Sequence, residues 1–256
     1  MRQFTPYLFL LLAASFLYSC KSAKLSDAEE KQRIGEYFEA AIYRKVYTKT
    51  PPAKRDLRGY IAFRMAECNR LINNTPRATS AYMNALRYKY PDSIVNLRLG
   101  QMYQKSGRYG EAVKYYNDYL LAEPGSVLAF NGVTGCEEAV KWKQSPTRYT
   151  VKRMDKFNSR RSEFSPMLYG EKYDQLYFAS TRTPKGAGKD KEETNSAITG
   201  QRNNDLFLVK QDENGAWLAP VELEDEVNTE FDEGTPSFSK DGNTMYYTYC
   251  AQDPEG

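Results

Sequence analysis

The chain contains no histidine among its 256 residues. Without an imidazole side chain, Ser-His-Asp or Cys-His catalysis, histidine-ligated zinc and a histidine general base are excluded. Carboxylate-based chemistry remains open, although no pair of carboxylates stands out. The acidic stretch from 222 to 233 lacks the spacing of a calcium-binding EF-hand loop. We therefore expect no catalytic residue, no metal site and no cofactor, and we expect that the protein is not an enzyme.

The sequence also shows little net charge and few cysteines. The formal charge is +3, so no broad basic surface is present and no nucleic-acid partner is expected. Of the four cysteines, Cys68 and Cys136 fall at the same position of predicted helices two repeats apart, too far apart for a disulfide. We expect both to be small buried apolar side chains, while Cys250 lies in a predicted strand without a mate.

A short apolar run near the N-terminus resembles a bacterial lipoprotein signal. Arg2 is followed by apolar residues from Tyr7 to Tyr18, about a dozen, which is too short to span a bilayer. The run ends in Leu17-Tyr18-Ser19-Cys20, similar to a lipobox. The resemblance implies a signal peptide over 1–19, an acylated tether over 20–27, and a membrane anchor on Cys20. An ordinary secretory signal with an incidental cysteine is the alternative.

The clearest motif lies between 93 and 126, where the sequence resembles a tetratricopeptide repeat. The small residues allow two helices to approach closely, and the tyrosines fill the space around them. A glycine permits the turn between the helices, and a proline follows the second one. The residues at signature spacing are Leu99, Gly100, Tyr103, Gly107, Tyr109, Ala112, Tyr116, Tyr119 and Pro124.

Further helical segments extend this repeat into an array over 28–145. A degenerate copy runs from Tyr60 to Tyr90, a helix is predicted over 28–46, and a capping helix over 127–143. Arrays of this type present a groove to a protein partner, so we expect a partner there. The alternative is a spacer that only holds the next domain away from the membrane.

After residue 149 the helical period is replaced by a repeated β pattern. Each copy has Glu-x-x-Pro-x-apolar, a polar turn and an apolar-aromatic strand, and a strand at Asp205–Lys210 with a turn at Asn214-Gly215 lies between them. The residues that define the copies are Glu163, Pro166 and Tyr177, then Glu233, Pro236, Asp241, Gly242 and Tyr246.

This pattern resembles the TolB-like, WD-like repeats of β-propellers. We therefore expect 149–256 to be the first one or two blades of an incomplete antiparallel β-propeller. Such a segment leaves strand edges unpaired, so it should fold poorly alone. The predicted fold class is α + β and multidomain, an α-solenoid followed by this β segment.

The order of these parts resembles PorE-like, OmpA-family lipoproteins of bacteria with type IX secretion, and it covers only the front of such a protein. The resemblance implies an outer-membrane lipoprotein that faces the periplasm and acts as a protein-protein adaptor. Peptidoglycan binding would belong to a C-terminal domain missing from this chain. Two alternatives remain: a surface nutrient-binding lipoprotein, and the non-catalytic front of a propeller-bearing peptidase, since no Gly-x-Ser-x-Gly occurs here.

Overall fold

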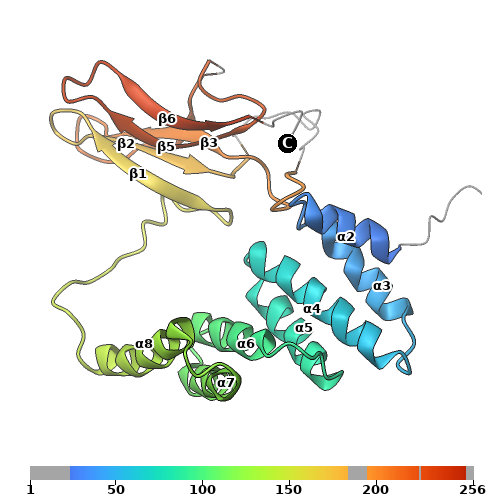
Figure 1. Ribbon diagram of the computed structural model, residues 1–256. Helices are drawn as coiled ribbons and strands as arrows, with labels where there is room; N and C mark the ends of the chain where they lie inside the picture. The colour runs from blue at the N-terminus through green and yellow to red at the C-terminus, as the bar shows by residue number, and fades with distance from the viewer. Residues whose placement is uncertain (1–23, 184–194, 225, 252–256) are drawn as a thin grey trace, which may run out of the picture. The chain divides into compact units, whose positions relative to one another are not determined.

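The computed structural model describes residues 24–183, 195–224 and 226–251 (Figure 1). The chain divides into two compact units between Lys143 and Gln144, one helical and one made of β-strands. The predicted signal peptide and lipidation site, Cys20, lie outside the described residues. Within the described part of the chain, no helix combines the length and the apolar character needed to cross a membrane.

The described part of the first unit contains seven α-helices that pack mainly as consecutive pairs. A short 3-10 helix, η1 (Glu39–Ile42), leads into the second of them. The α-helices are α2 (Leu25–Arg33), α3 (Tyr43–Lys49), α4 (Arg55–Leu71), α5 (Thr75–Arg87), α6 (Ile94–Lys105), α7 (Tyr109–Ala122) and α8 (Val127–Gln144).

The single helix predicted over 28–46 is wrong, because the chain breaks at Gly35. This glycine has a φ of 84°, a left-handed conformation that ends helices. The Glu36 N–H then donates to the carbonyl of Lys31, which closes the end of α2. As a consequence Ile34 and Phe38, which a continuous helix would bury, are exposed.

Local sequence also sets the ends of the paired helices. The Asn74 side chain accepts a hydrogen bond from the Arg77 N–H at the start of α5, where a proline occupies the first turn. At the end of α6, Gly107 has a φ of 71°, and the Arg108 N–H returns to the Tyr103 carbonyl. The pairs α4–α5 and α6–α7 therefore form the tetratricopeptide-like arrangement predicted from the sequence.

Two apolar clusters hold the helical unit together. The larger one joins α4 to α8 and is built largely from alanines with leucines and tyrosines between them, among them Ala66, Ala78, Tyr82 and Leu99. The smaller one, around Tyr43 and Ile61, fastens α2 and α3 to α4. Alanine-rich contacts let the helix axes lie close, so the unit buries a continuous core along the array.

The second unit consists of small antiparallel sheets. The four-stranded sheet has the order β1 (Glu163–Tyr169), β2 (Gln175–Ser180), β3 (Asp205–Lys210) and β4 (Val221–Glu222). A separate hairpin pairs β5 (Asp232–Phe238) with β6 (Met245–Cys250), and β5 packs against β1, β2 and β3 (Figure 1). No propeller is detected among these described strands. The structure shows small antiparallel sheets, and the predicted blades stay a prediction.

A compact aromatic core lies within the first sheet. Phe157, Phe178 and Phe207 are buried there with Leu176 and Val209, and Trp217 covers them. The turn predicted at Asn214-Gly215 is present, since Gly215 has a φ of 75° and the Asp212 N–H donates to the Ala216 carbonyl. After this turn the strand pairing is limited to a single bridge between Gln211 and Trp217 and to the two residues of β4, Val221–Glu222.

Candidate protein-interaction surface

The tetratricopeptide signature residues meet around the ring of Tyr116. Gly100 on α6 and Gly132 on α8 face this ring from two sides, and a Cβ atom would come within 2.6 Å of it at Gly100 and 2.5 Å at Gly132. The Tyr116 hydroxyl donates to Gln104 Oε1 over 2.6 Å, and burial raises the pKa of Tyr116 to about 12. The ring of Tyr116 on α7 therefore packs against both α6 and α8.

The remaining signature residues are placed around this contact. Leu99 and Ala112 are fully buried, and the ring of the buried Tyr103 stacks on Tyr115 with 5.3 Å between centroids. Tyr109 and Tyr119 pack at the margin of the same core, and the exposed Pro124 follows α7. Cys68 and Cys136 are buried and free, which confirms the expectation that they form no disulfide; Cys250 is exposed and free.

A partly buried ionic cluster connects the first helices of two successive pairs. Glu67 on α4 pairs with Arg70 over 2.7 Å and with Arg98 on α6 over 3.2 Å, and Tyr82 donates a hydrogen bond to it. Burial alone would raise the pKa of Glu67, but the hydrogen bonds from Arg70 and Tyr82 and the charges of Arg70 and Arg98 bring the net shift below the ordinary value. Glu67 therefore stays ionised and ties α4 to α6.

The face of α4 that carries Glu67 also carries Arg64 and Tyr60, one turn apart. The Arg64 guanidinium lies 6.0 Å from the centre of the Tyr60 ring. Its Nε atom is buried and has no hydrogen-bond partner in the described part of the chain. The Tyr60 hydroxyl donates to Glu29 over 2.8 Å, and burial first, then this bond, raises the pKa of Tyr60 to about 12.

This combination of residues, the α4–α6 surface, is defined by Tyr60, Arg64, Glu67, Arg98 and Gln101. Arg98 donates to Gln101 Oε1 over 3.1 Å, so the polar groups continue along α6. The sequence analysis missed this surface, although Arg64 and Arg98 recur 34 residues apart, once in each repeat. That periodic arginine was the signal that could have revealed it.

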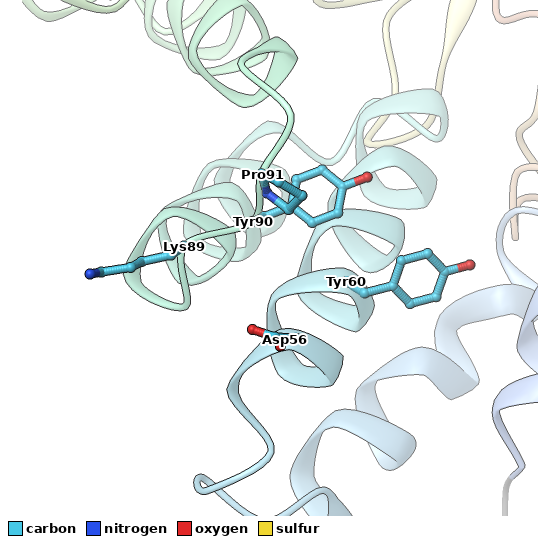
Figure 2. Close-up of a pocket in the computed structure, with 5 residues that line it drawn as sticks. All are labelled: Asp56, Tyr60, Lys89, Tyr90 and Pro91. Atoms are coloured by element: carbon cyan, nitrogen blue, oxygen red, sulfur yellow. The ribbon is translucent and has the colours of Figure 1, made fainter.

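A shallow cleft of about 400 Å³ opens beside this surface at the start of α4. Figure 2 shows Asp56 and Tyr60 rising from α4, and Lys89, Tyr90 and Pro91 on the segment between α5 and α6. The Tyr90 ring is stacked on Phe63 with 4.5 Å between centroids, which holds one wall in place. The cleft thus offers aromatic surface with charges of both signs at its rim.

In the second unit the two copies of the β motif superimpose in register. Phe164 pairs with Ala179 and Met167 with Tyr177 in β1–β2; Gly234 pairs with Thr248 and Ser237 with Tyr246 in β5–β6. Both first strands bulge at the same point, where Ser165 has a φ of 51° and Thr235 a φ of 48°. The bulge accommodates Pro166 and Pro236, which occupy the same position in the two copies and cannot donate to a regular ladder.

Equivalent motif residues of the two copies have different surroundings. Tyr177 packs against Phe238 with ring centroids 4.8 Å apart, whereas Tyr246 is exposed. Asp241 accepts hydrogen bonds from Ser239 and Asn243 in the second turn. Gly242 has a φ of 74°, and its carbonyl accepts from the Tyr169 hydroxyl over 2.8 Å, so the β5–β6 turn is fastened to β1.

The two repeated glutamates have matching first partners. Glu163 accepts hydrogen bonds from the Ser159 hydroxyl, and Glu233 accepts one from the Thr229 hydroxyl, in each case four residues earlier. The repeat therefore begins earlier than the sequence analysis placed it, at Asn158-Ser159 and Asn228-Thr229. The Asn228 amide bonds both the N–H and the carbonyl of Leu206, so this segment is anchored to β3.

The other partners of the two glutamates differ. Glu163 also accepts from Ser180 over 3.2 Å and pairs with Arg182 over 3.1 Å. In the second copy the strand register places Tyr249 opposite Glu233, where Ser180 stands opposite Glu163. Glu233 Oε2 is buried and has no hydrogen-bond partner within the described residues. No group of three or more metal-ligating side chains occurs in the described ranges.

The comparisons with known proteins give a limited result. No protein-family model matches the chain, and no curated protein matches it either. Among solved structures, the crystal structure of MamA protein is similar at 16% sequence identity, with a TM-score of 0.39. The similarity covers 50% of this chain and 77% of that one. A similarity this distant gives no information about the function of this chain.

Proposed function

We propose that this protein is a non-enzymatic adaptor of the bacterial cell envelope that holds a protein partner on its helical repeats. The observation that supports this proposal is the α4–α6 surface. It spans the first helices of two successive repeats and combines the ring of Tyr60 with the partly buried Arg64 and Arg98. Aromatic residues and arginine are the types that contribute most to protein-protein binding, and tetratricopeptide-like arrays use this side for extended partners.

The proposal includes an anchor and a location. Acylation of Cys20 in the lipobox-like sequence would hold the chain on the outer membrane, and the order of parts favours the periplasmic face. In this proposal the protein serves an OmpA-family assembly of the type IX secretion kind. Peptidoglycan binding would be provided by a separate domain rather than by residues present here.

The proposal also gives the β unit a place in the architecture. The meander β1–β2–β3–β4 has the strand order of a propeller blade, and β5–β6 repeats its first hairpin in register. We therefore propose that the two sheets are the first blade and the beginning of the second.

Site-directed photo-crosslinking in the source cells tests the adaptor function. A photoreactive residue is placed at Gln101, on the α4–α6 surface, and at Met83, an exposed residue of α5, as the matched control. We expect one discrete protein to be crosslinked from position 101 and not from 83. The same crosslink should weaken about tenfold in the Arg64→Ala variant if that arginine is a binding hot spot. Equal labelling from both positions would argue against a partner on this surface.

The anchor is tested separately by metabolic labelling with a radioactive fatty acid. We expect the label in the wild-type protein and its loss in Cys20→Ala, together with release of the protein from the membrane fraction. Cys250→Ala, which removes an exposed thiol of the β unit, is the control and should keep the label. Labelling that persists in Cys20→Ala would reject the lipobox assignment.

A further inference from the structure

The positive charge of the chain is concentrated in one short segment, residues 148–161, which we name the basic segment. It holds six basic residues and one acidic residue, a net charge of +5. The whole chain carries +3, so all other residues together carry −2. The basic residues are Arg148, Lys152, Arg153, Lys156, Arg160 and Arg161. The small net charge of the chain therefore conceals a strong local one.

The structure leaves these charges in contact with water. Residues 145–156, at the start of the second unit, are all exposed, and none of them lies in a helix or a strand (Figure 1). The single acidic residue, Asp155, pairs with Arg153 over 2.7 Å, and both side chains are exposed. Within the described part of the chain, the other cations of the basic segment form no ion pair. Most of the positive charge is therefore free to meet an external anion.

Exposed apolar side chains lie between the charged ones. Tyr149 is 72% exposed, Val151 is 96% exposed and Met154 is 50% exposed. None of them belongs to an apolar core, and the first residue of the segment that does is Phe157. Segments that lie on membranes combine these two kinds of side chain, because the cations meet lipid phosphates and the apolar groups enter between the headgroups.

The C-terminal end of the basic segment is held by the folded β unit. Phe157 is buried, and its N–H donates to the Met154 carbonyl over 2.9 Å, which closes a turn. The Ser159 N–H donates to the Glu163 carboxylate over 3.1 Å. The residues before this turn have no regular structure, so they can follow a flat surface without unfolding either core.

We propose that the basic segment binds an anionic lipid surface, with its lysines and arginines on the phosphates and Tyr149 and Val151 between the headgroups. Charge complementarity supports this partner, because neighbouring cations repel one another and a negative surface relieves that repulsion. A lipid surface fits better than a folded protein, since an exposed segment without helix or strand offers no fixed shape to complement. The contact does not require acylation of Cys20, and beside that anchor it is a second attachment to the membrane.

Co-sedimentation with lipid vesicles tests the proposal. The probe is the chain without its predicted signal peptide, residues 20–256, purified without acyl groups. The vesicles contain phosphatidylcholine alone, or phosphatidylcholine and phosphatidylglycerol in equal parts. We expect about tenfold stronger binding to the anionic vesicles or more. We also expect added salt to weaken the binding, because salt screens exposed charges.

Variants that change the charge of the segment show where the lipid binds. The double variant Lys152→Gln, Lys156→Gln should weaken binding about tenfold. The matched control Lys45→Gln, Lys49→Gln removes the same charge from exposed lysines of α3 and should leave binding unchanged. Asp155→Asn frees Arg153 from its only carboxylate partner within the described residues and should strengthen binding about threefold.

A fluorescence measurement tests the apolar part of the contact. Val151→Trp is made in a Trp142→Phe background, so that the only other tryptophan is Trp217 at the β core. We expect the emission maximum to move to shorter wavelength on anionic vesicles and to stay in place on phosphatidylcholine. An unchanged maximum on vesicles that bind the protein would overturn the placement of Val151 between the headgroups.

Equal binding to both kinds of vesicle, no binding to either, or equal losses in the two double variants would each overturn the proposal. An oligonucleotide that bound through Lys152 and Lys156, without any vesicle binding, would overturn it in favour of a different polyanion. The fatty-acid label of Cys20 is a separate measurement. Its absence would reject the anchor and leave the vesicle result standing, whereas absent vesicle binding would reject the basic segment and leave the anchor standing.

Discussion

Glu163 and Glu233 hold the same place in the two β hairpins, yet their surroundings shift the carboxyl pKa in opposite directions. Burial raises the pKa of Glu163, but bonds from Ser159 and Ser180 and the charge of Arg182 outweigh it, and the net shift is downward. Burial also raises the pKa of Glu233. The hydrogen bonds from Thr229 lower it, but the charges of Asp205 and Asp232 raise it further, and the net shift is upward. The surroundings of Glu163 stabilise its ionised form, and the surroundings of Glu233 destabilise its ionised form.

This contrast predicts opposite effects of the same substitution. Glu163→Gln should lower the free energy of unfolding of the β unit by about 2 kcal/mol, because it leaves the partly buried Arg182 without its charge partner. Glu233→Gln should be neutral or raise it by up to about 1 kcal/mol at neutral pH, since it removes a buried charge that forms no ion pair within the described part of the chain. Urea unfolding of the two variants checks this, and a loss of equal size in both would contradict it.

The same groups predict a pH dependence with two signs. The contribution of Glu163 is present above its ordinary pKa of 4.5 and is lost as the pH falls through the lower folded value. For Glu233 the folded pKa lies above 4.5, so its contribution is most favourable below 4.5 and is lost as the pH rises through the folded value. Relative to wild type, Glu233→Gln should therefore gain stability with rising pH, and Glu163→Gln should recover as the pH falls. Unfolding free energies measured from acidic to neutral pH would show this divergence.

At the scale of the helices, packing around Tyr116 depends on two glycines. Neither Gly100 nor Gly132 has room for a Cβ, because the Tyr116 ring occupies that space. By contrast Gly110, near the start of α7, has no heavy atom within 4 Å of where its Cβ would stand. All three lie in helices, where alanine is preferred over glycine, and Gly110 is the second residue of α7.

We therefore expect Gly100→Ala and Gly132→Ala to destabilise the helical unit by about 1–3 kcal/mol, since overpacking outweighs the helix preference of alanine. Gly110→Ala is the matched control and should stabilise it by about 0.5–1 kcal/mol. Thermal unfolding followed by circular dichroism measures all three. A gain in stability for Gly100→Ala would show that the ring moves aside at little cost.

The same elements show what the sequence could predict and what it could not. The repeat from 93 to 126 was predictable, because small and aromatic residues recur at a fixed period and only one packing satisfies them. The break at Gly35 was missed, because the apolar spacing of 28–46 continues through a glycine that ends α2. The Glu67–Arg98 contact was missed for a different reason: it joins separate helices, so the helical period does not encode it, and only the 34-residue recurrence of Arg64 and Arg98 points to this surface.

For the whole molecule, the important feature is that each unit has its own core. The helical clusters and the Phe157–Trp217 cluster share no residue. The segment between the units contains strongly exposed residues, with Tyr149 at 72% and Val151 at 96%. The chain has two tryptophans, and Trp142 lies in α8 while Trp217 lies in the β core, so one reporter exists for each unit.

Because the cores are separate, we expect the two units to unfold independently. In a Trp142→Phe background, fluorescence follows only Trp217, and circular dichroism is dominated by the helices. Gly100→Ala should then shift the dichroism transition and leave the fluorescence transition in place, whereas Glu163→Gln should do the reverse. Limited proteolysis should cut first between 145 and 156, and the helical fragment should resist further digestion. If both variants shifted both transitions together, the two units would unfold as one cooperative structure and the prediction would be wrong.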